Sequence, residues 1–400
     1  MVDRIAAIGD AFEVEDGGAG RDELLRELTW VLEDTVAEVQ EQEQADTTSS
    51  ASTTTSSGRD AGDGAGSSSG GASGGRAAAW RPCEWRQLEM DARSEQRRGG
   101  GGGGGAGAWR LRLRAPVAQL HALWERRLSA REPFQYLIAS AHWREFVLSV
   151  SPGVLIPRPE TEIMPELAAA ALAARPHLAN LPWADLGTGS GAVAIGTAAE
   201  LLQRSSSPAA SATEGAAAAD DDDPRVWAVD LSPVAVAHAR YNVASAGLAG
   251  SVEVVQGSWC DPIVHLAGRL GGLLSNPPYI PRAQMAGLQT EVGRHEPATA
   301  LDGGDGPGLD SLRVICADAV HMLAPGGLLA LETAGREQAH AVAAMLAAAT
   351  AGDAPGSARL REAVQASSGG DGAAAAFGDV AVVDDCYGVA RFVTGTRSGE

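Results

Sequence analysis

The chain has 400 residues, a formal net charge of −20 and 50 glycines. Tracts of Gly, Ser, Ala and Thr cannot supply an apolar core, so we expect a folded portion of roughly 300 residues. The acidic excess repels phosphates and therefore disfavours DNA or RNA as the direct substrate.

Cysteine spacing and apolar content argue against several further classes. The four cysteines are widely separated and form no C-x-x-C pair, which predicts neither a zinc site nor a disulfide framework. No apolar run reaches the length needed to cross a bilayer, so a soluble chain without a membrane partner is expected. The first 20 residues are acidic, unlike a secretion signal or a transit peptide, and leave targeting open.

The first 130 residues are expected to be helical and broken by linkers. Apolar residues at spacings of three and four predict helices over residues 21–40, 85–97 and 116–129. Low-complexity composition predicts disordered linkers at residues 45–79 and 98–107. The region therefore divides into a helical segment, 1–44, and a helical domain, 80–130.

After residue 152, short apolar strands alternate with helices, which is typical of an open, largely parallel sheet with helices on both faces. Strands are predicted over residues 183–186, 226–230, 252–255, 272–275, 327–332, 380–384 and 391–394. Residues 131–162 are expected to form an interdomain hairpin and loop, and residues 163–400 the main α/β domain. Two low-complexity insertions, 205–223 and 351–376, interrupt that domain, the second with a short helix at 358–366.

A glycine-rich turn, Asp185-Leu186-Gly187-Thr188-Gly189-Ser190-Gly191, follows the first of these strands. Glycines serve where backbone must approach a ligand closely or adopt a positive φ, and the N-terminus of the next helix favours an anion. The motif is ambiguous by itself. Gly187, Gly189 and Ala192 also fit the G-x-G-x-x-G/A pattern of dinucleotide enzymes, and a tight turn without a ligand would use the same glycines.

Asp230 ends the next predicted strand, where a carboxylate can accept hydrogen bonds from both hydroxyls of a ribose. It follows Gly191 by 39 residues, and removal of the low-complexity insertion restores an offset of about 20 residues. The competing role is a cap for the helix that begins at Ser232-Pro233, and the two roles are compatible. The glycine loop and the acid together predict a nucleoside ligand.

The sequence Asn276-Pro277-Pro278-Tyr279 follows the strand predicted at 272–275. Two successive prolines fix the backbone and remove two donors, so carbonyl oxygens project from a rigid turn. A planar amino group can donate one hydrogen to the Asn276 side-chain oxygen and the other to the Pro277 carbonyl, with Tyr279 packing on its plane. Such a clamp suits an amide or exocyclic amine and favours methyl transfer over hydride transfer. A plain proline turn explains Pro-Pro alone but not all four residues.

The glycine loop, Asp230 and the Asn-Pro-Pro-Tyr motif, in this order, resemble the seven-stranded S-adenosylmethionine methyltransferase fold. Flanking segments resemble the release-factor glutamine methyltransferases, the HemK/PrmC family, across residues 111–395 apart from the insertions. These segments are Glu132-Pro133-Phe134-Gln135-Tyr136-Leu137, Leu155-Ile156-Pro157-Arg158-Pro159-Glu160-Thr161-Glu162, Glu296-Pro297 with Ala300-Leu301-Asp302-Gly303-Gly304, and Asp385 with Gly388 and Arg391. The resemblance implies an α/β fold with a seven-stranded, mostly parallel Rossmann-like sheet and a small N-terminal helical domain.

The resemblance also implies S-adenosylmethionine as cofactor and assigns its contacts. The implied cofactor residues are Gly187, Thr188, Gly189, Ser190 and Gly191 at the methionine end, Asp230 at the ribose, Trp259 near the adenine, and Asn276. Asn276, Pro277, Pro278 and Tyr279 would hold the substrate and carry catalysis, and Arg158, Glu160 and Glu162 would lie on a substrate loop over the active site. Core packing for Trp259 and an exposed ion-pair cluster for the loop are the competing assignments. Ile138-Ala139 departs from the family pattern.

The function implied is methyl transfer from S-adenosylmethionine to the side-chain amide of a protein glutamine, in the Gly-Gly-Gln motif of a peptide-chain release factor. Three alternatives stay open: a ribosomal-protein glutamine methyltransferase, a DNA adenine N6-methyltransferase, and a non-catalytic cofactor-binding subunit. The net charge argues against the DNA enzyme. We expect a monomer that binds a release factor but no nucleic acid. The compartment is open: mitochondrion or chloroplast in a eukaryote, otherwise cytoplasm.

Overall fold

The structure is a computed structural model that describes residues 16, 18–42, 81–82, 108–113, 116–205, 224–350, 353, 355–357, 359–360, 362 and 375–399. The linkers predicted at 45–79 and 98–107, the helix predicted at 85–97 and the insertion after residue 205 lie outside the described residues. The chain divides into two compact units: one contains Ala19–Ser129, and the other contains Asp16–Gly18 and Ala130–Glu400. Within the described residues, no helix is both long and apolar enough to span a membrane.

The first unit combines helices with a small antiparallel sheet. Its elements are α2 (Arg21–Thr35), β1 (Val36–Gln42), β2 (Arg81–Pro82), β3 (Ala108–Leu113), α4 (Val117–Glu125) and a π-helical turn at Arg126–Ala130, with the strand order β2-β1-β3. The helix predicted to continue to residue 40 is wrong beyond Thr35. Val36 begins a strand instead, because β-branched residues tolerate the extended conformation and pairing with β3 satisfies the backbone.

Leu24 and Leu28 of α2 are buried together with Trp124 of α4 and the nearby Leu128. A two-pronged ion pair lies beside them, with Arg127 Nε 2.7 Å and Nη2 3.0 Å from the two carboxylate oxygens of Glu27. Of the apolar face predicted for residues 116–129, Leu120 and Trp124 are buried, whereas Val117 is exposed. The amphipathic pattern therefore places the core of this unit between its two helices.

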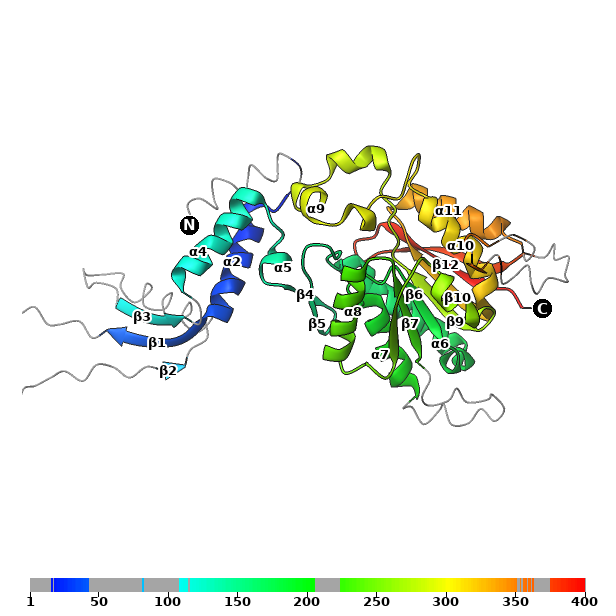
Figure 1. The fold of residues 1–400 in the computed structure, drawn as a ribbon, viewed down its shortest axis with the longest axis horizontal. Helices are drawn as coiled ribbons and strands as arrows, with labels where there is room; N and C mark the ends of the chain where they lie inside the picture. Colours follow the sequence, from blue (N-terminus) through cyan, green and yellow to red (C-terminus); the bar gives the residue numbers. More distant parts are fainter. Residues whose placement is uncertain are drawn as a thin grey trace, which may run out of the picture. The chain divides into compact units, whose positions relative to one another are not determined.

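The second unit is built on a seven-stranded sheet with the order β11-β12-β10-β9-β6-β7-β8 (Figure 1). Its strands are β6 (Trp183–Leu186), β7 (Val226–Asp230), β8 (Val252–Gln256), β9 (Leu270–Ser275), β10 (Leu323–Glu332), β11 (Phe377–Asp384) and β12 (Ala390–Arg397). Neighbouring strands pair in parallel except for β12, which is antiparallel to both β10 and β11. All the predicted strands are present, and the predicted α/β fold is confirmed.

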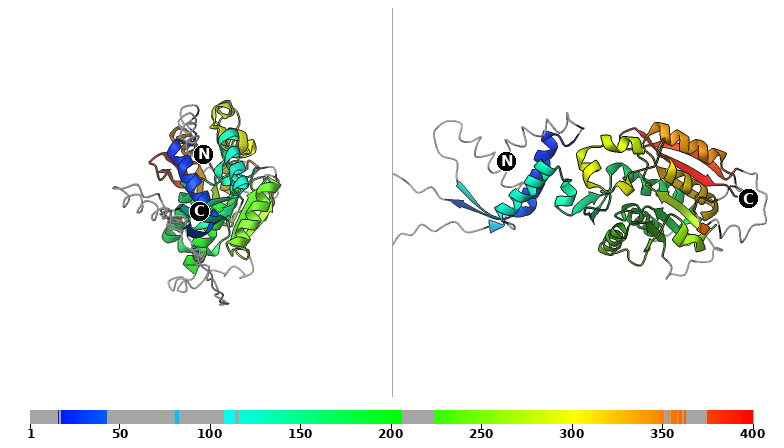
Figure 2. Two further views of the ribbon diagram at one scale, coloured as in Figure 1. Left: turned by 90° about the vertical axis from the view of Figure 1, so that its left-hand side faces the viewer. Right: turned by 45° about the horizontal axis from the view of Figure 1, so that its top comes forward.

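Helices cover both faces of this sheet (Figures 1 and 2). On one face α6 (Ile163–Ala174), α7 (Ala192–Ser205) and α8 (Pro233–Ser245) bury a core with β6, β7 and β8. On the other face, α10 (Asp310–Met322) and α11 (Arg336–Ala348) bury a second core. The remaining elements are α5 (Phe134–Leu137), the hairpin β4 (Ser140–Trp143) and β5 (Phe146–Ser149), α9 (Thr290–His295), and short 3₁₀ turns at Pro159–Glu162, Pro176–Asn180, Asp261–Leu266, Arg282–Gly287 and Ala298–Ala300.

Part of the segment 351–376 packs into the second core, which its composition gave no reason to expect. Leu360 is fully buried there. The backbone N–H of Ser357 donates a 2.8 Å hydrogen bond to Asp318 Oδ1 on α10. The described helical residues of the segment, 359–360 and 362, fall inside the short helix predicted at 358–366.

Leu360→Ala is therefore expected to lower the free energy of unfolding by about 2–5 kcal/mol, because truncating a buried leucine leaves a cavity. Urea denaturation followed by circular dichroism measures this change. Val147→Ala, at a side chain that is 57% exposed, is the control and should barely move the midpoint. An unchanged midpoint for Leu360→Ala would show that the segment does not stabilise the core.

Candidate functional site

The carboxyl ends of four adjacent strands form the base of the candidate site. In the sheet register, Leu186 lies beside Val229 and Ser275, and Ser275 lies beside Leu331. The residues that follow these four, namely Gly187, Asp230, Asn276 and Glu332, therefore lie side by side at one edge of the sheet, where the strands have their carboxyl ends. The chain adds β7 and β8 on one side of β6 and then returns to place β9 on the other side. Such a switch point is where open α/β sheets bind ligands.

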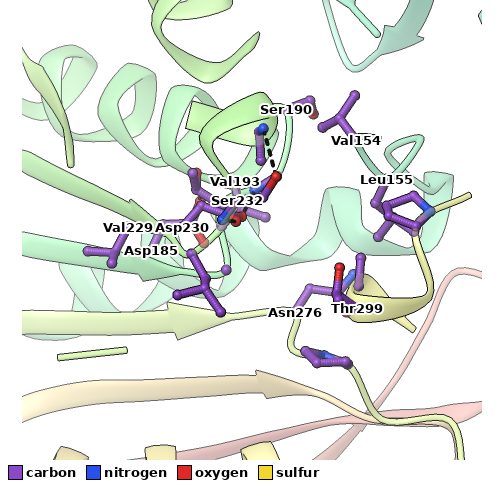
Figure 3. A pocket seen from close by; sticks show the side chains of 18 of the residues that line it. Val154, Leu155, Asp185, Ser190, Val193, Val229, Asp230, Ser232, Asn276 and Thr299 are labelled. Atoms are coloured by element: carbon purple, nitrogen blue, oxygen red, sulfur yellow. Dashed lines mark hydrogen bonds between the residues drawn. The ribbon is translucent and has the colours of Figure 1, made fainter. Parts of the chain in front are cut away.

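A cavity of about 420 Å³ opens at this edge, within the size range of small-molecule sites. Figure 3 shows Asp230 and Asn276 on different sides of it, with Leu155 across from Asp230. The predicted residues that line it are Arg158, Gly187, Thr188, Gly189, Ser190, Asp230, Trp259, Asn276 and Pro278. The predicted residues that do not line it are Glu160, Gly191, Pro277 and Tyr279. The structure thus brings most of the predicted cofactor residues together around one cavity.

The glycine loop joins β6 to α7 through left-handed backbone. Gly187, Gly189 and Gly191 have φ values of 72°, 56° and 87°, which disfavour residues with a Cβ. At Gly191 a Cβ would also lie 3.3 Å from the backbone of Ala239 in α8. Asp185 secures the loop from below, since its Oδ2 accepts hydrogen bonds from Thr188 Oγ1 at 2.6 Å and from the backbone N–H of Ala194 at 3.0 Å. Burial raises the pKa of Asp185 to about 7.

Asp230 connects the glycine loop to the start of α8. Its Oδ2 accepts a 2.8 Å hydrogen bond from the backbone N–H of Gly189, and its Oδ1 accepts one of 2.8 Å from Ser232. The helix cap is Ser232 itself, whose hydroxyl accepts from the backbone N–H of Ala235 at 3.3 Å. Burial raises the pKa of Asp230, while the backbone donors oppose that rise. Each carboxylate oxygen retains a further lone pair that can accept from a ligand hydroxyl.

Trp259 lies against the cavity and the α10–α11 core at once. Its side chain is half-buried and packs on that core. A Cβ built on Gly187 would lie 3.8 Å from its ring. Its backbone has a φ of 42°, unusual for a bulky residue, and such strain gathers at ligand sites. The competing assignments of core packing and ligand contact are therefore compatible.

Asn276 and Tyr279 belong to one buried hydrogen-bond network. Asn276 Nδ2 lies 3.2 Å from Thr161 Oγ1, and the Thr161 hydroxyl lies 2.7 Å from Glu332 Oε2. Tyr279 donates its hydroxyl to Glu332 Oε1 at 3.1 Å. Burial raises the pKa of Glu332 to about 7 and also raises that of Tyr279. Tyr279 thus holds Glu332 from outside the cavity wall.

Arg158 forms its ion pair with Glu296 rather than with the acids of its own segment. Arg158 Nη2 lies 2.7 Å from Glu296 Oε1, and Glu296 Oε2 accepts from the backbone N–H of Ile156 at 3.3 Å. The Glu296 side chain is 1% exposed. Glu162 accepts from the backbone N–H of Arg144 at 2.9 Å, away from the cavity. The competing assignment of an exposed ion-pair cluster is therefore wrong for Arg158, which anchors its loop to a buried carboxylate.

Comparison with known proteins decides the family. A release factor glutamine methyltransferase of Gloeobacter violaceus is 42% identical to this chain over 229 residues, which are 56% of this chain and 71% of that protein. The chain belongs to the release factor glutamine methyltransferase family. A second member, from Thermosynechococcus vestitus, is 42% identical over 241 residues, or 60% of this chain and 75% of that protein.

A family model and the solved structures give two further comparisons. A family model described as an RMKL-like methyltransferase domain matches residues 158–291. Among solved structures, TrmN from Thermus thermophilus is 19% identical and covers 58% of this chain and 48% of its own, with a TM-score of 0.32. As a member of this family, the chain is a methyltransferase, and S-adenosylmethionine is its methyl donor.

Two residues of this methyltransferase site, Thr161 and Glu332, received no role from the sequence. Thr161 lies between two charged residues, Glu160 and Glu162, and a lone threonine in a loop carries no signal of its own. Glu332 carried a usable signal, because it is an acid at the end of a buried apolar strand that pairs with β9. Parallel neighbours end at the same edge, so its proximity to Asn276 was accessible in principle. The position of the Thr161 hydroxyl between Asn276 and Glu332 was not predictable from the sequence.

Proposed function

We propose that this methyltransferase transfers a methyl group to the side-chain amide nitrogen of the glutamine in the Gly-Gly-Gln motif of a peptide-chain release factor. The relatives that share 42% identity are named release factor glutamine methyltransferases. The observation that carries the proposal is the position of Asn276, which lines the cavity with its amide nitrogen already bonded to Thr161. The Asn276 oxygen thus stays available to a planar amino group.

The cavity has a volume in the range of small-molecule sites and is lined in part by Thr188, Ser190 and Asp230. We propose that the backbone from Gly187 to Gly191 holds the methionine end, that Asp230 accepts the ribose hydroxyls and that Trp259 contacts the adenine. The support is that left-handed glycines let backbone approach a ligand and that Asp230 lies at the strand end where nucleosides bind. When bound, the cofactor supplies an electrophilic methyl group.

A glutamine amide nitrogen is a weak nucleophile, because its lone pair is delocalised into the carbonyl. The proposed work of Asn276 and of the Pro277 carbonyl is to accept the two amide hydrogens and hold the nitrogen in line with the methyl group. Such positioning contributes up to about 7–11 kcal/mol in favourable cases. Accepting both hydrogens also stabilises the positive charge that develops on nitrogen as the methyl–sulfur bond breaks, before the nitrogen loses one of its two protons to solvent. Pro278 and Tyr279 keep the turn rigid.

The domain roles are likewise proposals. We propose that residues 131–162, which include Arg158 and Glu160, act as the substrate loop beside the main domain, 163–400. We also propose that the enzyme works as a monomer and makes no direct contact with nucleic acid, which its net charge of −20 supports.

The decisive experiment is methylation by the full-length chain with labelled cofactor and three separate acceptors: a release factor, ribosomal proteins and duplex DNA. Label should enter the release factor, and replacing the glutamine of its Gly-Gly-Gln motif should abolish incorporation. Label in ribosomal protein or DNA alone would establish one of the rival functions. The absence of label from every acceptor would support a non-catalytic subunit.

Asp230→Ala is expected to weaken S-adenosylmethionine binding about 10–150-fold, the equivalent of about 1.5–3 kcal/mol for hydrogen bonds to a charged group. Isothermal titration calorimetry measures the dissociation constant. Asp305→Ala, at a side chain that is 85% exposed on the surface, serves as the charge control and should leave that constant unchanged. An unaltered constant in a folded Asp230→Ala protein would overturn the ribose assignment.

A further inference from the structure

We propose that Thr161 and ionised Glu332 are positioning residues that keep the Asn276 carboxamide turned with its oxygen toward the substrate glutamine. This inference rests on the proposed function and concerns the same site. The three side chains come from three different segments: the 3₁₀ turn Pro159–Glu162, the end of β9 and the end of β10. They meet through two hydrogen bonds of 3.2 and 2.7 Å.

The direction of these two bonds follows from the number of available protons. An ionised carboxylate only accepts, so the single hydroxyl proton of Thr161 is donated to Glu332. The Thr161 oxygen must then accept from Asn276, and the only donor on that side chain is its amide nitrogen. With Glu332 ionised, the available protons thus fix the orientation of the carboxamide.

The Asn276 oxygen is consequently left for the cavity. Among the described residues, no donor is recorded for Asn276 Oδ1, and the residue lines the cavity wall. Thr161 and Glu332 are 4% and 1% exposed, so water does not compete for their hydrogen bonds. A buried network of this kind holds one arrangement when every member is satisfied.

Protonation of Glu332 would remove that constraint. The carboxyl would gain a proton to donate, which frees the Thr161 hydroxyl to donate to Asn276 and lets the carboxamide turn its NH₂ toward the cavity. The glutamine amide would then face donors instead of an acceptor. The orienting arrangement therefore requires the ionised form of Glu332.

Four groups set the charge state of Glu332. Tyr279 and Thr161 donate hydrogen bonds to it and favour ionisation, as does the charge of Arg391 from β12, which is itself paired with Asp385 at 2.9 Å. Glu160 opposes ionisation through its like charge. Burial outweighs the favourable contacts and brings the pKa of Glu332 to about 7. Turnover should therefore decrease as the pH drops below about 7. The positive charge of a bound sulfonium would favour ionised Glu332 and so shift this decrease to lower pH.

The test is the single-turnover rate of release-factor methylation by the full-length chain between pH 5.5 and 8.5. At pH 8, Thr161→Val should reduce the rate constant about 3–10-fold, the worth of one hydrogen bond, with cofactor affinity unchanged by calorimetry. Thr161→Ser should restore the rate, because it restores the hydroxyl. Glu332→Gln should abolish the acidic fall, because it removes the titrating group. Glu200→Gln, at a carboxylate paired with Arg144 away from the site, should retain that fall.

A wild-type rate for Thr161→Val, or an acidic fall that survives in Glu332→Gln, would overturn the positioning role while leaving the proposed function intact. If the wild-type chain fails to methylate a release factor at any pH, the proposed function itself fails, and this inference fails with it. A slow Thr161→Val that Thr161→Ser does not rescue would assign the loss to packing and would also overturn the inference.

Discussion

Asn276→Ala is expected to lower the single-turnover rate of methylation by about 10²–10³-fold, because it removes one preorganised polar contact at the reacting centre. The fold should survive. Asn276 lies at a turn already fixed by Pro277 and Pro278, and its side chain donates a hydrogen bond to Thr161. Cofactor affinity should change much less than the rate, since the proposed partner of Asn276 is the substrate amide.

Single-turnover kinetics with purified release factor, run beside calorimetry of cofactor binding, separates the chemical step from binding. Asn276→Asp retains an acceptor but adds an anion where the cofactor carries its positive charge. It should therefore stabilise the charged ground state and also slow transfer. Wild-type turnover by Asn276→Ala would rule out the amide clamp and leave only a cofactor-binding fold.

Arg158→Ala is expected to lower the free energy of unfolding by about 3 kcal/mol at pH 8, because it leaves the buried Glu296 carboxylate without its ion-pair partner. Glu296 is 1% exposed and relies on Arg158 for charge compensation. Burial raises the pKa of Glu296, and Arg158 lowers it. Loss of Arg158 therefore raises that pKa further above the value in the unfolded chain.

The stability lost in Arg158→Ala depends on pH. A carboxyl with a raised pKa in the folded state destabilises the fold as the pH rises through that pKa, whereas below the unfolded pKa it is protonated in both states. The decrease in the free energy of unfolding caused by Arg158→Ala should thus be larger at pH 8 than at pH 5, as measured by urea denaturation. Arg282→Ala breaks a pair in which Arg282 is 57% exposed, so it should leave stability unchanged at both values. Equal losses at the two pH values would contradict the role assigned to Glu296.

The sheet was predictable because each strand carries its own local signal. Short apolar runs bounded by glycine, proline or an acid predicted all seven strands, although β9, β10, β11 and β12 start earlier than predicted and β8 and β12 end later. The N-terminal unit was less predictable. Val36 and Val39 continue the helical spacing of α2, yet pairing with a distant segment, β3, makes them strand residues. Local periodicity does not contain that long-range choice.

The candidate site shows the same division between local and distant information. Motifs of consecutive residues, such as the glycine loop and Asn276-Pro277-Pro278-Tyr279, were visible because spacing alone places them at strand ends. The pairing of Arg158 with Glu296 spans 138 residues, and the bond from Thr161 to Glu332 spans 171. No regular sequence spacing predicts either of these two contacts. Such contacts depend on how separate loops meet above the sheet.

The parallel strands run between two opposite edges of the sheet, one formed by their amino ends and the other by their carboxyl ends. The strands deliver Gly187, Asp230, Asn276 and Glu332 to one edge. The extra chain after α7 leads into the first residue of β7, and the extra chain after α11 leads into the first residue of β11. Both therefore join at the opposite edge. Added length there enters at the amino ends of β7 and β11, whereas a residue inserted directly after β6 or β9 would displace the reacting groups.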